Sequence, residues 1–167
     1  MDTKELDWVE HLFIASTHDY ILVFTSSGKM YWLKVHEIPD VGADGRGKAV
    51  ANLVQMEPGE KIAAMLAIKE FDDTHFIVMG TRKGTIKKTE LSAFSNPRAG
   101  GIIAVGLEEG DSLVGVNLCR ADQSIVLGTA DGMSIRFEEA DARAMGRSAV
   151  GVWGIRLEDG DEVRDMV

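Results

Sequence analysis

The 167-residue sequence contains little cysteine and proline, and it has no long uncharged hydrophobic run. Its one cysteine, Cys119, excludes an internal disulfide and a cysteine-rich zinc site, and this usage is typical of a reducing cytoplasm. Because no stretch of about 18 uncharged apolar residues occurs, no membrane-spanning helix is predicted. The segment Met1 to Glu5 lacks the basic start and apolar core of a signal peptide.

Motifs of catalysis and cofactor binding are also missing. The four histidines have no metal-ligand spacing and no His-Glu-x-x-His motif. The glycines around Arg46 and the pair Gly100 and Gly101 do not match a phosphate-binding loop and are not predicted to open a helix. We therefore expect a non-catalytic chain without cofactor or metal.

The sequence has 18 glycines, and many recur at matched positions. Each of three marker glycines follows a threonine by three residues and an isoleucine by seven. A second glycine comes later in each unit, with a leucine six residues beyond it. The marker glycines are Gly28, Gly84 and Gly132, the threonines Thr25, Thr81 and Thr129, and the second glycines Gly47, Gly101 and Gly151. A period of about 50 residues built from short apolar runs and turns is typical of propellers and β-arrays.

Each repeat reads as four short strands separated by turns. The apolar run Leu12 to Ala15 is the first strand predicted, and β-branched and aromatic residues dominate the runs Tyr20 to Phe24 and Phe76 to Met79. The marker glycines supply the positive φ of hairpin turns. The fold class predicted is therefore all-β, a propeller-like array of four-stranded blades.

About three blades are expected, in repeats 8–58, 59–109 and 110–159, with a further repeat starting at 160–167. Because propellers usually have about four to eight blades, residues 1–167 are expected to form part of a larger domain.

The net charge is −9, which by itself argues against a nucleic-acid partner. The charge is unevenly distributed, however. Between Arg82 and Arg98 there are five basic residues and one acidic residue. Acids gather instead at a third glycine of each repeat, which is Gly59, Gly110 or Gly160. Basic residues recur in register and could share one outer rim that follows a phosphate backbone. Ordinary solvated strand positions explain them equally well. The candidates are Lys29, Arg46, Lys48, Arg82, Lys83, Lys87, Lys88, Arg98, Arg136 and Arg147.

Two long runs resemble a known family. The run from Lys87 to Val105 and the run from Arg143 to Leu157 are similar to the C-terminal region of the A subunits of DNA gyrases. The resemblance extends from about Asp7 to Val167. One feature departs from the family: its Gln-Arg-Arg-Gly-Gly-Lys-Gly box is absent, and the segment Gly42 to Lys48 is a degenerate counterpart containing an aspartate.

The resemblance implies a β-pinwheel, a propeller variant that exchanges strands between blades. It implies that the outer rim binds and bends double-stranded DNA, supporting negative supercoiling by an ATP-dependent type II topoisomerase, without catalysis by this part. The expected protein partners are the remainder of the gyrase A subunit, through which the chain meets the B subunit, with no membrane. The expected location is the bacterial cytoplasm, at the nucleoid. The alternative is a propeller that binds other proteins and no DNA.

Overall fold

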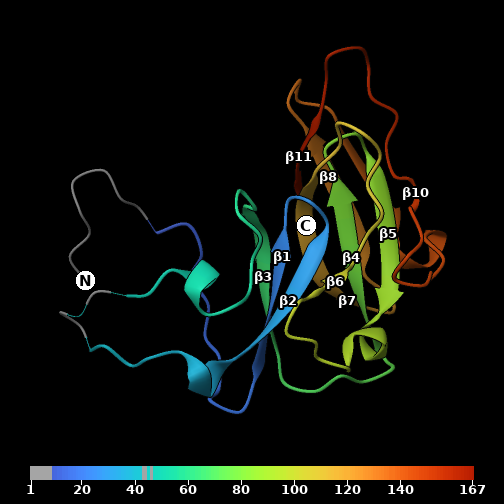
Figure 1. The fold of residues 1–167 in the computed structure, drawn as a ribbon. Helices are drawn as coiled ribbons and strands as arrows, with labels where there is room; N and C mark the ends of the chain where they lie inside the picture. Colours follow the sequence, from blue (N-terminus) through green and yellow to red (C-terminus); the bar gives the residue numbers. More distant parts are fainter. Residues whose placement is uncertain (1–8, 43–44, 46) are drawn as a thin grey trace.

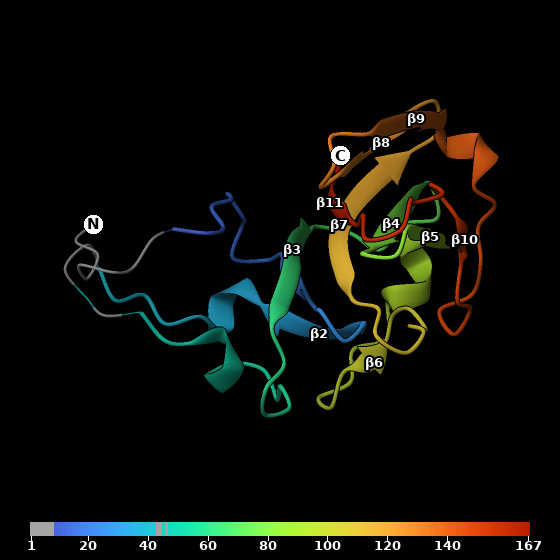
Figure 2. The same ribbon diagram turned by 90° about the horizontal axis from the view of Figure 1, so that it is seen from above.

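The computed structural model describes residues 9–42, 45 and 47–167, and its regular elements are strands and single-turn 3-10 helices. The strands form three antiparallel sheets that stand side by side, as Figure 1 and Figure 2 show. The all-β fold predicted from the repeat is therefore confirmed. The part of the chain that is described contains no helix long and apolar enough to cross a membrane.

The first sheet has the strand order β3-β1-β2-β6. Its strands are β1 (Tyr20–Thr25), β2 (Lys29–Lys34), β3 (Ile62–Ile68) and β6 (Ile102–Ile103). The hairpin β1-β2 pairs Phe24 with Met30 across the turn that holds Gly28. The short strand β6 comes from the following repeat and pairs Ile102 with Met30.

The second sheet repeats this arrangement in the order β10-β5-β4-β7. Its strands are β4 (His75–Thr81), β5 (Thr85–Glu90), β7 (Leu113–Arg120) and β10 (Val152–Trp153). Again the outermost strand is contributed by the next repeat, since β10 pairs Val152 with Ile86. The third sheet contains three strands among the described residues, in the order β11-β8-β9: β8 (Ser124–Thr129), β9 (Ser134–Glu138) and β11 (Val163–Met166).

Strand exchange explains how short linkers join neighbouring sheets. The linkers contain the 3-10 turns η1 (Val35–Glu37), η2 (Val50–Asn52), η3 (Leu91–Phe94) and η4 (Glu139–Asp141). After η3 and after η4 the chain returns to the outer edge of the preceding hairpin before it enters the next sheet. Each of the first two sheets is thus built from two repeats, which ties adjacent sheets together through backbone hydrogen bonds.

Hydrophobic side chains fill the spaces between the sheets. Leu22 and Phe24 face the second sheet and pack in a cluster with Ile77 and Met79. A second cluster between the second and third sheets includes Leu127. Each fully buried side chain of this size contributes about 1.5–3 kcal/mol to folding. The inner strand β7 contacts both β3 and β11, so the innermost strands of the three sheets line up along one side.

The alternate residues of β1 point to the opposite face, where Ile21 and Val23 form a third cluster with Val54 from the loop after η2. The strand predicted over Leu12 to Ala15 is wrong. Among the described residues 9–19 no strand forms, and the side chains of Leu12 and Ile14 are 90% and 98% exposed. No hairpin of the described structure pairs with this run, so its backbone receives no ladder hydrogen bonds.

Candidate nucleic-acid interface

The basic residues of the β4-β5 turn lie against an acidic turn. The Nη2 atom of Arg82 donates a hydrogen bond to the carbonyl of Gly110 at 2.7 Å. The Nζ atom of Lys83 donates to the carbonyl of Glu109 at 2.6 Å, and its backbone N–H donates to Asp111 Oδ1 at 2.9 Å. The acidic turn at Gly110 therefore lies directly against these basic residues, and the two turns bind each other.

The same arrangement holds in the first sheet. The ammonium group of Lys29 forms an ion pair with the carboxylate of Glu57, and this hydrogen bond raises the pKa of Lys29. A lysine whose charge is matched by an adjacent carboxylate offers little net attraction to a phosphate. The turn residues Lys29, Arg82 and Lys83 are therefore the weakest of the predicted contacts.

Lys87 and Lys88 are buried, so their predicted place on an exposed rim is wrong. Their exposed fractions are 1% and 5%. The Nζ atom of Lys87 donates to the carbonyl of Ala104 at 2.8 Å and to the carbonyl of Arg147. Lys88 forms an ion pair with the buried carboxylate of Glu139. Both side chains act between repeats, where carbonyl and carboxylate oxygens replace the water that a buried ammonium loses.

The position four residues after each marker glycine has one structural role in two repeats. The indole Nε1 of Trp32 donates to the carbonyl of Phe94 at 2.8 Å, and Nζ of Lys88 donates to the carbonyl of Glu139 at 3.1 Å. Both acceptors belong to the 3-10 turn of the next repeat. Arg136 occupies the same position in β9 and is exposed. Arg136 shares this register with Trp32 and Lys88, and its contact with DNA stays a prediction.

Arg98 and Arg147 lie in the loops that lead into the outermost strands. Arg98 is exposed, and its carbonyl accepts a hydrogen bond from the backbone N–H of Gly101 at 2.9 Å, which closes a tight turn. Gly101 has a φ of +70°, and a Cβ at this position would lie 2.8 Å from the carbonyl oxygen of Met30. Glycine is required because the loop backbone packs directly on the preceding hairpin. The loop therefore holds the backbone of Arg98 in a defined place at the outer edge of the sheet.

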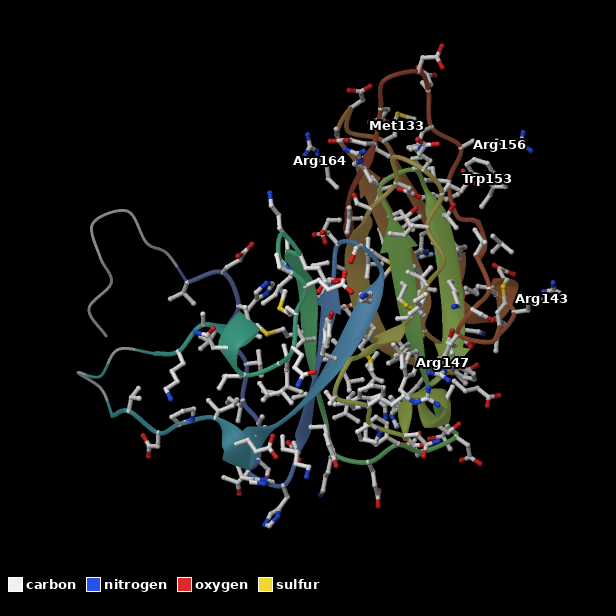
Figure 3. All side chains as sticks on the ribbon, viewed as in Figure 1. Met133, Arg143, Arg147, Trp153, Arg156 and Arg164 are labelled. Carbon is white, nitrogen blue, oxygen red and sulfur yellow. The ribbon has the colours of Figure 1, made fainter. Side chains whose placement is uncertain are left out.

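The second loop is richer in arginine than the repeat analysis predicted. Residues 142–156 contain three arginines and no acidic residue. In Figure 3, Arg143, Arg147 and Arg156 lie along the side of the molecule that carries β10, with Trp153 among them. Arg143 and Arg156 are exposed and Arg147 is half-buried. Arg143 and Arg156 were missed because they recur in no other repeat, although the absence of acids from the whole segment was a visible signal.

The corresponding segment of the second repeat is likewise free of acids. Residues 91–107 carry Arg98 and no acidic residue. In the first repeat, Lys48 is exposed, whereas Arg46 lies outside the described residues. The loops that lead to the outer strands thus carry basic charge in a chain whose net charge is −9. We define the linker arginines as Arg98, Arg143, Arg147 and Arg156.

The described residues contain no group of three or more His, Cys, Asp or Glu side chains placed to hold a metal ion. The thiol of Cys119 is buried, and burial raises its pKa. A raised pKa keeps the thiol protonated and poorly nucleophilic.

Comparisons with known proteins agree with this architecture. The sequence profile of the DNA gyrase C-terminal domain, a beta-propeller, matches residues 19–69, 75–120 and 123–167. The chain is 49% identical to the A subunit of DNA gyrase from Clostridium acetobutylicum over 154 residues, which covers 92% of this chain and 19% of that relative. The chain thus spans about a fifth of the length of that relative.

Two solved structures share the fold. The C-terminal domain of DNA topoisomerase IV superposes with a TM-score of 0.83 at 30% identity, over 90% of this chain and 47% of that one. The DNA gyrase A C-terminal domain superposes with a TM-score of 0.76 at 24% identity, over 90% of this chain and 48% of that one. The matched profile covers most of the chain and follows its three sheets, and so this protein belongs to the family of DNA gyrase C-terminal domains.

Proposed function

We propose that this chain binds and bends double-stranded DNA as part of the DNA-wrapping domain of a gyrase. The linker arginines neutralise phosphates and release counterions, which is the dominant source of affinity in sequence-independent binding. The observation that carries the proposal is the acid-free segment 142–156 with three arginines along one side, in a chain of net charge −9. Loops that pack on rigid hairpins keep these charges at fixed spacing.

The proposal extends to the protein as a whole. The DNA segment held by this domain supports negative supercoiling, which the other parts of the two gyrase subunits carry out, and this domain itself is non-catalytic. DNA binding and supercoiling take place in the bacterial cytoplasm, at the nucleoid. Bending a site of about 20–30 bp by 40–90° costs about 1–6 kcal/mol, so several phosphate contacts must act together.

An equilibrium titration of the chain into a fluorescently labelled 40-bp duplex at low salt tests the proposal. We expect binding with equal affinity for two duplexes of unrelated sequence, because phosphate contacts carry no base information. The double variant Arg98→Ala/Arg147→Ala should bind more weakly on both duplexes. Arg164→Ala is the matched control, since Arg164 lies at 2.9 Å from Glu162 in an acidic turn. Equal loss in the control and the double variant would contradict the assignment of the interface.

A protein-binding module remains the rival function, and exposed apolar side chains favour it. Trp153 and Met133 are 71% and 64% exposed. Large exposed apolar side chains that gather in one patch mark interaction sites. The titration separates the two functions, because a protein-binding module predicts no DNA binding even at low salt.

A further inference from the structure

Lys87 is a buried lysine whose ammonium group contacts a later segment of its own repeat and a loop of the next repeat. From β5 its ammonium group donates to the carbonyl of Ala104, just after β6, and to the carbonyl of Arg147, in the loop before β10. Among the described residues it forms no ion pair with a carboxylate. One side chain thus connects the outer edge of the first sheet, at β6, to the loop that leads into β10 of the second sheet.

A buried ammonium without a carboxylate is costly, and an apolar side chain of similar length would fill the same space more cheaply. Burial lowers the pKa of Lys87 to about 8, with a further decrease from the nearby charge of Arg147. The amine is still mostly protonated at neutral pH and so retains its full set of donors. The side chain therefore gives up hydration to hold two backbone carbonyls in place.

The loop around Arg147 is tied to β5 on its upstream side and forms a turn at Arg147 itself. The backbone N–H of Met145 donates to the carbonyl of Lys88 at 2.8 Å, and the N–H of Ala149 donates to the carbonyl of Gly146 at 3.1 Å. Neither bond involves Arg147 itself. Arg147 is a central residue of the turn that the Ala149 bond closes, and the hydrogen bond from Lys87 to the Arg147 carbonyl ties this turn to β5. The bond ends at the residue whose guanidinium is a proposed phosphate contact.

We propose that Lys87 is a positioning residue for DNA binding, which fixes the backbone of Arg147 so that its guanidinium meets a phosphate at the outer edge of the second sheet. This inference rests on the proposed function. Lys87 makes no contact with DNA itself, because its side chain is covered by protein.

Lys88 provides a contrast to Lys87, because its ammonium group contacts Glu139 at the start of the same linker. Its ammonium pairs with the carboxylate of Glu139 and lies 4.7 Å from the centre of the Phe76 ring. In the linker its ammonium group contacts Glu139, eight residues upstream of Arg147, so the side chain places no direct restraint on that residue. Losing Lys88 should destabilise the fold without acting specifically through Arg147.

A double-mutant cycle on DNA affinity tests the inference in the full chain. The proteins are the parent, Lys87→Met, Arg147→Ala and the combination, each titrated with the 40-bp duplex at several salt concentrations. We expect Lys87→Met to raise Kd by about 3- to 10-fold at low salt and to reduce the salt slope by about 0.9, the value of one phosphate contact. In the Arg147→Ala background, Lys87→Met should change neither quantity. In an Arg98→Ala background its effect should remain in full.

The background dependence separates positioning from simple loss of charge. A long-range charge effect of Lys87 would persist without Arg147, and that result would overturn the inference. An unchanged salt slope in folded Lys87→Met would overturn it as well. If the parent shows no DNA binding, the proposed function fails first, and the inference fails with it.

If Lys87→Met does not fold, amide hydrogen exchange of the unaltered chain tests instead whether the loop that contains Arg147 is held in place. The N–H of Ala149 reports on the loop that holds Arg147. A held loop predicts exchange slowed by about 100-fold or more relative to an unstructured peptide. Exchange at the unstructured rate would show that the loop is not positioned and would overturn the inference.

Discussion

The hydroxyl of Thr81 accepts a hydrogen bond from the backbone N–H of Thr85 at 3.2 Å, across the turn that contains Gly84. The same bond recurs in the third sheet between Thr129 and the N–H of Met133 at 3.2 Å. In each turn the marker glycine also donates to the threonine carbonyl. The threonine and the glycine are therefore two parts of one turn, which is why they recur together in the sequence.

Replacing Thr81 by alanine should destabilise the protein by about 1 kcal/mol, because the partly buried N–H of Thr85 loses its acceptor. Urea denaturation followed by circular dichroism measures the change. Thr81→Ser keeps the hydroxyl and is the matched control. Equal losses in the two variants would show that the hydroxyl is not the stabilising group.

Substitutions at Gly84 and Gly132 test whether the segment after β10 packs closely on the β4-β5 turn, because only Gly84 contacts that segment. Their φ angles are +88° and +82°, so alanine is strained by similar amounts, about 1–2 kcal/mol. A Cβ at Gly84 would lie 2.6 Å from the carbonyl oxygen of Ile155, whereas a Cβ at Gly132 would meet nothing within 4 Å. We expect Gly84→Ala to cost about 1–3 kcal/mol more than Gly132→Ala, because overpacking adds to backbone strain. Equal costs in urea denaturation would contradict the close packing of the segment after β10 on the β4-β5 turn.

The buried Lys87 predicts a rise in stability on the alkaline side. Its pKa is lowered to about 8 in the folded protein from an ordinary value of 10.5, through burial and the charge of Arg147. Between these values the unfolded chain binds more protons than the folded chain, so its contribution to unfolding free energy increases with pH. Denaturant titrations at pH 7.5 and 10 should show this increase in the parent relative to Lys87→Met. An identical pH dependence in both proteins would contradict the shift.

Glu60 predicts a dependence of the same sign on the acidic side, where stability is lost as the pH falls. Burial would raise the pKa of its carboxyl, but hydrogen bonds from the Tyr31 hydroxyl, the Glu57 N–H and the hydroxyls of Ser27 and Thr25 outweigh burial and lower it. The resulting stability is present above the ordinary pKa of 4.5 and is lost as the pH falls through the folded value. Glu60→Gln should be less stable than the parent at pH 6 and should lose less on acidification to pH 3. A constant difference between the two proteins would contradict this assignment.

The repeat could be predicted because the turn chemistry is local. Glycine is favoured wherever φ is positive, and Gly28, Gly84 and Gly132 all have that conformation. Strand exchange could not be predicted from the residues alone, because a two-residue strand such as Ile102–Ile103 has the same apolar character whichever hairpin it joins. In this chain only the family resemblance carried that feature.

The buried lysines escaped prediction for a related reason. Lysine is almost never fully buried unless it finds a partner, so sequence reasoning favours the surface for Lys87 and Lys88. Their partners are two backbone carbonyls and Glu139, which lie between 17 and 60 residues away along the chain. Interactions at such separation leave no local pattern. The linker loops did leave a visible signal, the absence of acidic residues from one continuous segment, but the repeat analysis did not use it and missed Arg143 and Arg156.

The salt dependence of duplex affinity tests the DNA interface most directly. If the four linker arginines each neutralise one phosphate, a plot of log affinity against log salt should have a slope of about −3.6, at about 0.9 per contact. The four-fold variant Arg98→Ala/Arg143→Ala/Arg147→Ala/Arg156→Ala should flatten the slope towards zero, while Arg164→Ala leaves it unchanged. A slope near zero in the parent, or the same slope in the parent and the four-fold variant, would contradict DNA binding by these loops.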